Sequence, residues 1–503
     1  MPKHLHEIRD PIHVFVRLDT DERSVVDSAP FQRLRHIHQL ATTFLIYPGA
    51  THKRFEHCLG VMELAGRVFD VVTHPYNIHE DIRRVIPQIT DPKQLGYWRS
   101  CLRMAALCHD IGHLPFSHAA EKELLPEEWD HERLSRELIL SPEMRNLFNA
   151  MTPPLRAEDV VKLAVGPEEA NDLSFSTWET ILAEIIVGDA FGVDRMDYLL
   201  RDSHHAGVPY GRFDHHRLID TLRILPSPPA QGDSLSQGDP VAQESGAPTI
   251  GVQGNVPQDA PAQTSSTAVA ANQSGVAPPP VVNPAQHSHP SYIQYPREPA
   301  LGIEEGGLHS AAALMVARFF MYSQLYFHPI RRAYDIHLKD FLKDWLSGGQ
   351  FPTDANRHLE VTDNEVTSAL LHASRTPAAP GHDAARRLMC RDHFRLLYQR
   401  HPEDVAINPE AGEAIFSAAC EEFGEERVRR DRYSQRSGAP DFPVLTKDGR
   451  IASSLAMSQT LTQLEAVSID FVFVDKAILN KAQDWLRENR LAIITPTEGP
   501  DDE

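Results

Sequence analysis

The strongest constraint on the fold is the spacing of apolar residues in the first 225 positions. Apolar side chains recur at intervals of three and four in FQRLRHIHQLATTFL, EHCLGVMELAGRVFDVV, CLRMAALCHDIGH and TWETILAEIIVGDAF. This period gives each helix an apolar stripe, which is buried most readily against the stripe of another helix. The sequence therefore predicts a mainly α fold with a core of packed helices.

A change of composition interrupts this pattern at residues 226–300. The segment is rich in Pro, Ala, Gly, Ser and Gln and has almost no aromatic residues, as in GVAPPPVVNPAQHSHP. It buries too little apolar surface to offset its ordering entropy, so we expect a disordered insertion. The flanks RLIDTLRILP and PALGIEEGGLHSAAALMVARFF predict two strands, the second followed by a helix, within one folded unit.

The rest of the chain completes the predicted organisation. The core spans residues 1–225 and continues through 301–345, where YSQLYFHPIRRAYDIHLKDFLKDWL predicts helix. In residues 346–490, a regulatory or oligomerisation region, SIDFVFVD predicts a strand and DKAILNKAQDWLREN a helix. Residues 491–503 are an acidic tail. The predicted class is mainly α, with small β-hairpin elements and a mixed α+β C-terminal region.

Charge and composition exclude several classes of function. Asp and Glu total 70 against 49 for Lys and Arg, and the net charge of −21 repels nucleic acid and anionic membranes. No apolar run of about 18 residues and no signal-peptide pattern is present, so we expect a cytoplasmic protein. The five cysteines include no CxxC pair, which argues against a disulfide framework and against a thiolate zinc site.

Four polar residues indicate a metal site. His109 and Asp110 are adjacent in HDIGHLPFSH, where a glycine and a proline supply a bend, and His57 and Asp194 lie on other predicted helices. Two imidazoles and two carboxylates suit Mn, Fe, Co, Ni or Zn and leave positions open for water and a substrate oxygen. The alternative is that the histidines are ordinary core residues. A second dipeptide, His382-Asp383, predicts a solvated helix start.

Three further groups of residues favour a hydrolytic site. His118 with Glu121, and His131 with Glu132, are pairs suited to general acid or base catalysis, although each is also typical of a surface ion pair. A helical stripe is predicted to line a wet cleft, and it comprises Asp194, Tyr198, Arg201, Asp202 and His205. Cations for a phosphate ester are available at Arg54, Arg195 and Arg331-Arg332, with Tyr326 and Tyr334 for ring or sugar contacts.

The runs RDPIH, FQRLRHIHQL, YPGATHKRFEHCLGV, LCHDIGHLPFSH, VDRMDYLLRDSHHAG and RRAY resemble those of deoxynucleoside triphosphate triphosphohydrolases. This branch of the HD superfamily includes the animal SAM-and-HD-domain enzyme and many bacterial relatives. The resemblance covers residues 5 to about 340, apart from the insertion. It implies an HD-domain helical core and hydrolysis of a dNTP to deoxynucleoside and triphosphate, with Mg²⁺ on the substrate phosphates.

The resemblance also implies roles for individual residues. His57, His109, Asp110 and Asp194 would bind the metal, and His118 would be the general acid, oriented by Glu121, with His113 and His131 close by. Arg54 and Arg195 would contact phosphates; Gln39, Tyr198, Asp202 and Tyr334 would contact the sugar, and Leu40 the sugar or base. Tyr326 and Ile330 depart from the pattern, because the animal enzyme has an arginine and a histidine there.

Regulation is a further implication. Members of this group are typically homotetramers activated by nucleotides, and Asp27, Gln32 and Arg35 match part of a guanine-nucleotide activator site, although the last two also suit a helix surface. Two alternatives remain. The same ligands suit a nucleotide phosphomonoesterase or phosphodiesterase, and a non-catalytic nucleotide-sensing effector would keep the pocket without turnover.

Overall fold

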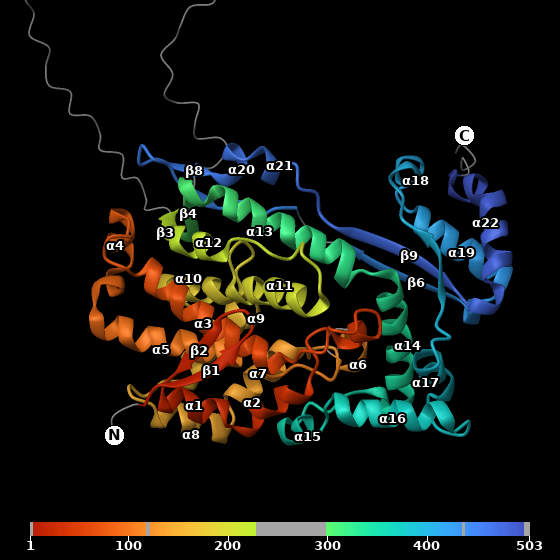
Figure 1. Cartoon of the computed structure of the whole chain (residues 1–503), viewed down its shortest axis with the longest axis horizontal. Coiled ribbons are helices and arrows are strands. Elements are labelled where there is room, and N and C mark those ends of the chain that lie inside the picture. Colours follow the sequence, from red (N-terminus) through yellow and green to blue (C-terminus); the bar gives the residue numbers. More distant parts are fainter. Residues whose placement is uncertain (1–3, 117–120, 228–297, 435–437, 497–503) are drawn as a thin grey trace, which may run out of the picture. The chain divides into compact units, whose positions relative to one another are not determined.

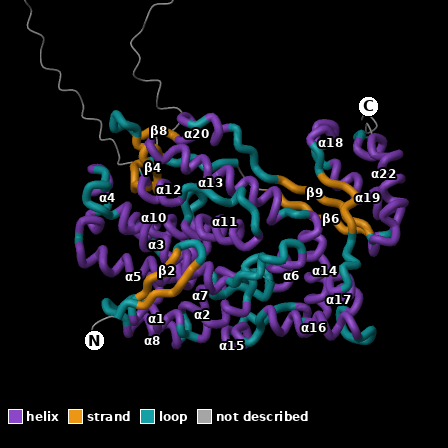
Figure 2. The backbone as a smooth tube through the Cα atoms, in the orientation of Figure 1, coloured by secondary structure: helices purple, strands orange, loops and turns teal. Residues whose placement is uncertain are grey.

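The computed structural model describes residues 4–116, 121–227, 298–434 and 438–496, and helices dominate these ranges (Figures 1 and 2). The mainly α class predicted from the sequence is confirmed, with small sheets beside the helices. The predicted insertion at 226–300 lies almost wholly outside the described residues. No helix of the described ranges is both long and apolar enough to cross a membrane.

The first half of the chain supplies twelve helices among the described residues. They are α1 (Thr20–Val26), α2 (Ala29–Arg33), α3 (Arg54–Val72), α4 (Glu80–Val85), α5 (Pro92–Cys108), α6 (Glu121–Leu124), α7 (His131–Ile139), α8 (Pro142–Ala150), α9 (Ala157–Glu169), α10 (Thr177–Val187), α11 (Val193–Ala206) and α12 (His215–Thr221). The largest hydrophobic cluster lies where α3, α5, α9 and α10 pack together. The predicted apolar stripes meet there.

One predicted helix is broken. The run FQRLRHIHQLATTFL forms α2 as far as Arg33, and then two 3₁₀ turns, Leu34–His36 and Ala41–Leu45. Between them the backbone N–H of His38 donates to the Asp363 carboxylate, 2.7 Å away, and His38 pairs with Lys53 as an isolated bridge. A distant side chain therefore takes a backbone donor that a continuous helix would have used, and tertiary contacts override local propensity.

Short sheets flank the helices. Strands β1 (His6–Asp10) and β2 (Val14–Leu18) form an antiparallel hairpin. The two segments predicted as strands on either side of the insertion are β3 (Leu222–Pro226) and β4 (Pro299–Glu304), which pair antiparallel. β7 (Pro443–Leu445) and β8 (Ile451–Ser453) extend that sheet, so the flanks of the insertion and the C-terminal region share one sheet.

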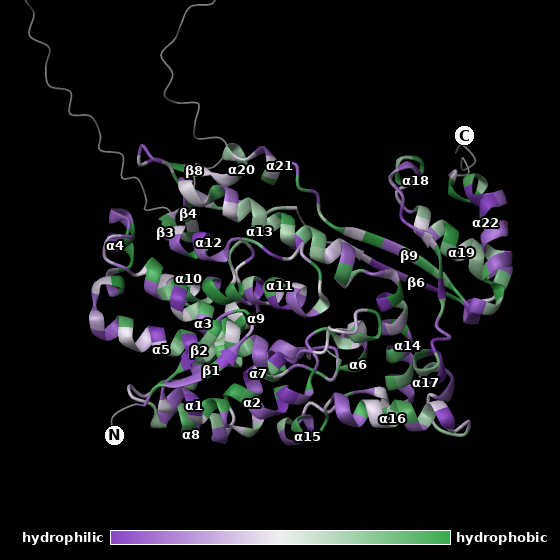
Figure 3. Ribbon diagram, in the orientation of Figure 1, coloured by the Kyte–Doolittle hydropathy of each residue, from purple (hydrophilic) through white to green (hydrophobic). Residues whose placement is uncertain are grey.

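The second half contains ten helices and a second sheet within the described ranges. The helices are α13 (Leu308–Met321), α14 (Pro329–Trp345), α15 (Ala355–Leu359), α16 (Asp363–Arg375), α17 (His382–Met389), α18 (Pro402–Ile407), α19 (Ala411–Phe423), α20 (Ser454–Met457), α21 (Gln459–Thr462) and α22 (Leu479–Ile494). The sheet has the order β5 (Arg395–Gln399), β9 (Ser468–Val474), β6 (Val428–Ser434). The predicted strand SIDFVFVD is β9, coloured largely green in Figure 3, and the predicted helix after it is α22.

The helix predicted at YSQLYFHPIRRAYDIHLKDFLKDWL is divided. A π-helical turn, Tyr322–Tyr326, follows α13, and α14 begins at Pro329. Proline fixes its own φ and lacks an N–H, so it suits the first position of a new helix. The break turns Tyr326 toward α11, where its hydroxyl donates to Asp202 at 2.7 Å.

The five cysteines carry free thiols, as the absence of a CxxC pair suggested. Three are buried, one is partly exposed and one is exposed: Cys58, Cys101, Cys108, Cys420 and Cys390. Burial raises the pKa of the Cys58 thiol well above its usual value, which keeps it protonated and chemically inert.

Candidate metal centre

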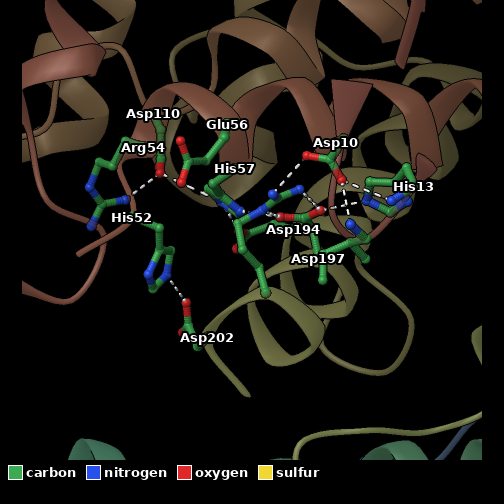
Figure 4. Close-up of polar contacts among 12 residues, drawn as sticks. Asp10, His13, His52, Arg54, Glu56, His57, Asp110, Asp194, Asp197 and Asp202 are labelled. Atoms are coloured by element: carbon green, nitrogen blue, oxygen red, sulfur yellow. Dashed lines mark hydrogen bonds and ion pairs between the residues drawn. The ribbon is translucent and has the colours of Figure 1, made fainter. Parts of the chain in front are cut away.

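Three helix ends bring the four predicted ligands together, and Figure 4 shows His57, Asp110 and Asp194 among them. His57 lies in the first turns of α3, His109 and Asp110 follow the end of α5, and Asp194 lies in the first turn of α11. Asp194 Oδ1 is 3.0 Å from His57 Nε2 and 3.5 Å from His109 Nε2. Asp110 Oδ1 is 3.4 Å from His109 Nε2, and Asp110 Oδ2 is 3.8 Å from His57 Nε2.

The two imidazoles are oriented as metal ligands would be. His57 Nδ1 donates to Asp197 at 2.8 Å, and His109 Nδ1 donates to the Ala106 carbonyl, also at 2.8 Å. Among the described residues, both Nε2 atoms are buried and make no hydrogen bond of good geometry, although Asp194 Oδ1 lies 3.0 Å from one and 3.5 Å from the other. A buried nitrogen without a hydrogen bond costs free energy, and a metal ion relieves that cost. The nitrogen and oxygen donors fit a divalent transition metal at this position.

Electrostatics point to the same conclusion. Burial lowers the pKa of the His57 imidazole, but the carboxylates of Asp194 and Asp197 outweigh it and raise the pKa to about 10. Burial also raises the pKa of Asp194, but His109 and His57 reverse this and keep it well below its usual value. The Asp194 carboxylate is thus ionised at neutral pH, and the carboxylates that hold a proton on His57 could stabilise a metal cation in place of that proton.

Access to the cluster is from one side. The side chain of Asp194 is 34% exposed, whereas those of His57, His109 and Asp110 are at most 8% exposed. Water and a substrate oxygen would therefore approach beside Asp194. Arg54, almost fully buried, forms a short ion pair with Asp110 Oδ2 and places a guanidinium next to the centre.

The turn after α5 is shaped by a glycine. A Cβ on Gly112 would lie 2.4 Å from the His131 carbonyl and 2.2 Å from the Ser135 backbone nitrogen, so the chain can pass α7 only without a side chain. Ser135 fixes the turn: its hydroxyl donates to the His109 carbonyl at 2.8 Å and accepts from the Gly112 N–H at 2.9 Å. The predicted bend holds Asp110 toward the cluster.

Beside the metal ligands, two histidines stack with ring centroids 4.0 Å apart. His113 Nε2 lies 3.1 Å from Asp110 Oδ1, and His131 Nδ1 donates to Glu121 at 2.6 Å. Burial, Arg54 and His131 lower the pKa of His113 well below its usual value. Burial also lowers the pKa of His131, but Glu121 raises it to about 9. One ring is therefore neutral and its neighbour protonated at pH 7, a division that suits acid–base chemistry.

His118, the predicted general acid, lies outside the described residues. Among the described residues Glu121 bonds both the ring and the backbone N–H of His131. The sequence predicted a pair of His131 with Glu132, but in the structure the His131 side chain bonds Glu121, is 19% exposed and stacks on His113. His131 is therefore the better-supported proton donor within the described part of the chain.

Comparison with known proteins agrees with this geometry. The family model of the HD domain matches residues 54–166, and that of the HD associated region matches residues 296–422. Residues 54–166 form an HD domain. The HD-domain family comprises metal-dependent phosphohydrolases, and in this chain the HD domain contributes His57, His109 and Asp110, while Asp194 lies beyond its C-terminal boundary.

Relatives resemble parts of the chain. Human "Deoxynucleoside triphosphate triphosphohydrolase SAMHD1" is 32% identical over 241 residues, which are 43% of this chain and 36% of that protein. "Uncharacterized protein YwfO" of Bacillus subtilis is 27% identical over 66% of this chain and 54% of its own length. A crystal structure of a hypothetical protein from Aquifex aeolicus matches with a TM-score of 0.67 and 26% identity, over 96% of this chain and 100% of that one.

Several predicted substrate residues lie around the HD domain. Asp202 accepts from His52 Nε2 and from the Tyr326 hydroxyl, each at 2.7 Å. The Tyr198 ring meets Tyr326 edge-on, with centroids 6.1 Å apart. The side-chain oxygen of Gln39 is buried and lacks a hydrogen bond among the described residues. Tyr326, which departs from the family pattern, thus contacts the predicted sugar-binding carboxylate directly.

Three other residues predicted to contact the substrate, Arg195, Tyr334 and Leu40, lie in different surroundings. Arg195 Nη1 donates to the Asp189 carbonyl, and Nη2 lies 3.3 Å from the Asp189 carboxylate. Tyr334 is fully buried in a second apolar cluster, and its hydroxyl makes no hydrogen bond within the described ranges. Leu40 is 7% exposed and belongs to the main core cluster.

The predicted activator residues gather on and near α2. Gln32 donates to the Val26 carbonyl at 2.8 Å and accepts from Arg35 at 2.9 Å, and Arg35 lies over the Phe55 ring, 3.5 Å from its centroid. Asp27 pairs with Arg23 in an exposed i,i+4 ion pair. These contacts are those of an ordinary helix surface. They neither support nor contradict the predicted activator site.

The predicted stripe on α11 is more buried than expected. Arg201 is fully buried and ion-paired with Asp197 and Asp10, so it does not line a wet cleft. Asp197, Asp10, His13 and His52 were not singled out by the sequence. Asp197 carried one usable signal: an aspartate between Met196 and Leu199, both buried, needs a buried partner.

The second His-Asp dipeptide behaves as predicted. His382 begins α17, its ring nitrogen lies 2.7 Å from the Ala373 carbonyl, and Asp383 is exposed in the first helical turn. A carboxylate there interacts favourably with the helix dipole.

Proposed function

We propose that this protein hydrolyses deoxynucleoside triphosphates to deoxynucleoside and triphosphate in a metal-dependent reaction. The observation that carries the proposal is the convergence of two buried imidazole Nε2 atoms, which make no hydrogen bond among the described residues, with the carboxylates of Asp110 and Asp194. The side chain of Asp194 is partly exposed there. Likeness to human SAMHD1 over 241 residues supports the dNTP as substrate.

The residues divide the chemistry among themselves. When bound, a divalent metal supplies Lewis-acid polarisation of a phosphoryl oxygen and activates water. His57, His109, Asp110 and Asp194 would hold it. Arg54 places a positive charge beside Asp110. That charge would stabilise the negative charge that develops on the phosphoryl group in the transition state.

Proton transfer would fall to His131, the first residue of α7, and to His113 in the loop after Asp110. His131 is protonated at neutral pH through its bond to Glu121, and so holds a proton for the departing oxygen. His113, which is neutral, contacts Asp110 and lies between His131 and the metal ligands. Mg²⁺ would accompany the substrate phosphates, as triphosphates carry several negative charges at neutral pH.

The proposal also covers recognition of the deoxyribose and regulation of the enzyme by a nucleotide. Asp202, Tyr198 and Gln39 would contact the deoxyribose. The Gln39 side-chain oxygen makes no hydrogen bond among the described residues, so it could accept one from a sugar hydroxyl. We further propose a homotetramer activated by a nucleotide bound near Asp27, Gln32 and Arg35, by analogy with the family that the sequence resembles.

The test is a product analysis. Purified protein is incubated with each of the four dNTPs and four rNTPs with Mn²⁺ or Mg²⁺, and the products are separated by ion exchange. Deoxynucleoside with intact triphosphate supports the proposal. Orthophosphate as the sole phosphate product would instead establish the phosphomonoesterase alternative, and nucleotide binding without turnover would establish the sensor.

A variant ties the reaction to the centre. Asp194→Ala removes a carboxylate between the two imidazoles, so turnover should fall below detection while the fold is retained. Metal content is measured alongside. Undiminished hydrolysis by this variant would remove Asp194 from the site.

A further inference from the structure

We propose that Asp197 is a positioning residue for the metal centre, fixing the His57 imidazole, and that the N-terminal hairpin turn holds Asp197 in place. The proposal rests on the metal site described under the proposed function, but not on the identity of the substrate. Asp197 is three residues beyond Asp194 on α11 and is fully buried.

Both oxygens of Asp197 are fully engaged. Oδ2 accepts from His57 Nδ1 and from Arg201 Nε, each at 2.8 Å. Oδ1 accepts from His13 Nε2 at 2.7 Å and from Arg201 Nη2 at 2.9 Å. With four donors from three side chains, the carboxylate cannot rotate. His57 is therefore kept in the tautomer with its proton on Nδ1, and the lone pair of Nε2 faces the ligand cluster.

A second layer of contacts reaches the N-terminus. Arg201 Nη1 donates to Asp10 Oδ2 at 2.8 Å, and Asp10 Oδ1 accepts the backbone N–H groups of Ile12 and His13, each at 2.8 Å. Asp10 ends β1, and His13 lies in the turn before β2. Figure 4 shows both side chains beside Asp197. The hairpin turn thus closes a buried network that ends on a metal ligand. Because every charge in it is paired, removing one member is costly.

The helix that carries His57 has a matching feature one turn further on. A Cβ on Gly60 would lie 2.0 Å from Asp197 Oδ1 and 2.4 Å from Arg201 Nη2. α3 can therefore approach the Asp197–Arg201 pair only where it has no side chain. This close approach is what allows the His57 ring to reach the carboxylate.

The same helix offers a matched comparison. Asp202 is also a buried aspartate of α11, and it also accepts from a buried histidine, His52, at 2.7 Å. His52 is not one of the residues grouped around the metal position. Substituting either aspartate disrupts a buried aspartate–histidine pair on α11. If disrupting such a pair were enough to weaken metal binding, substitutions of Asp197 and Asp202 would both weaken it. A positioning role predicts weaker binding for the Asp197 substitution alone.

The experiment measures metal affinity without substrate. The full chain is stripped with chelator, and Mn²⁺ binding is titrated by calorimetry for the wild type, Asp197→Asn and Asp202→Asn, with thermal melts of each metal-free protein. The amide cannot accept four hydrogen bonds, so Asp197→Asn should bind Mn²⁺ about 10- to 100-fold more weakly. Asp202→Asn should bind like the wild type. Equal affinity for Asp197→Asn and the wild type overturns the proposal, as does equal weakening in both variants.

A milder variant covers the case in which Asp197→Asn does not fold. His13→Gln removes one imidazole donor from Asp197 Oδ1 and leaves the carboxylate on His57. It should weaken Mn²⁺ binding several-fold, and wild-type affinity in His13→Gln would then reject the proposal. A wild-type chain that binds Mn²⁺ but does not cleave dNTPs contradicts the proposed function alone, so the two failures are distinguishable.

Discussion

The metal cluster and the loop after Asp110, which contains His113 and Phe116, are held in different ways. The cluster is fixed from within the first half of the chain, by helix ends and by the network from Asp10 to Arg201. The loop after Asp110 is fixed from the second half. Asp363 of α16 accepts the Phe116 N–H at 2.7 Å, and Arg33 links the carbonyls of His113 and Val361, at 2.8 Å each.

This difference indicates that the HD associated region positions the loop after Asp110. Within this region the described residues, 298–422, contribute no ligand to the cluster, but Val361 and Asp363 hold the segment that carries His113. Phe116 has a positive φ of 55°, a conformation that a bulky residue adopts only when its surroundings enforce it. Metal binding and acid–base chemistry should therefore be separable by mutation.

The largest separation is expected for Asp363→Ala. The change removes the acceptor for Phe116 N–H and for His38, whose ring and backbone both bond the carboxylate. Leaving these buried donors unpaired costs about 1–3 kcal/mol each, so the loop should shift and hydrolysis should fall at least about tenfold. Mn²⁺ affinity, titrated in the same preparation, should remain within about twofold of the wild type.

The neighbouring residue provides the control for that variant. Asn364→Ala removes an amide that bonds the exposed His36, and it should leave both measurements unchanged. If Asp363→Ala also lost Mn²⁺ affinity, the metal cluster and the loop after Asp110 would depend on the same contacts. That result would contradict their separate support.

An intermediate effect is expected for Glu121→Gln. His131 has a folded pKa of about 9, above its unfolded value of about 6.5. The stability from its protonation is therefore fully present below pH 6.5 and is lost as the pH rises through 9. The variant should be less stable than the wild type by on the order of 1–3 kcal/mol at pH 6, and the difference should shrink by pH 9.5.

Urea unfolding at the two pH values and a ring-proton NMR titration of His131 would measure this. Asp110 and Glu132 also face His131 and act in the same direction as Glu121, so part of the elevation should persist. Glu123→Gln, which affects an exposed pair with Lys339 and Lys343, is the matched control and should show no such change between pH 6 and 9. A His131 pKa unaltered in Glu121→Gln would mean that Glu121 does not set its charge.

The smallest effect is expected for the second His-Asp dipeptide. His382→Ala loses a contact to the Ala373 carbonyl and should cost about 1 kcal/mol of stability or less. Metal stoichiometry, measured by mass spectrometry of the bound ion, should be identical to that of the wild type. A change in metal stoichiometry would show that the HD associated region, which contains His382, holds a second metal site.

Much of the site was predictable because helix period and residue chemistry are local properties. Cys108, the last residue of α5, lies just before the predicted bend, and His57, His109, Asp110 and Asp194 meet as their residue types suggested. The failures share a cause. The helix predicted across His38 is broken by Asp363, which lies over 300 positions away, and Arg201 leaves its predicted cleft to pair with Asp10.

The sequence by itself therefore determined the helices, the strands that flank the insertion, and the set of groups able to bind a metal, because each follows from short-range periodicity or from the chemistry of a side chain. Tertiary structure decided which nitrogen of each histidine faces the centre, that Glu121 pairs with His131, and that Asp197 is tied to the N-terminal turn. Those choices depend on hydrogen bonds between residues far apart in the chain, whose partners are set only when the helices pack.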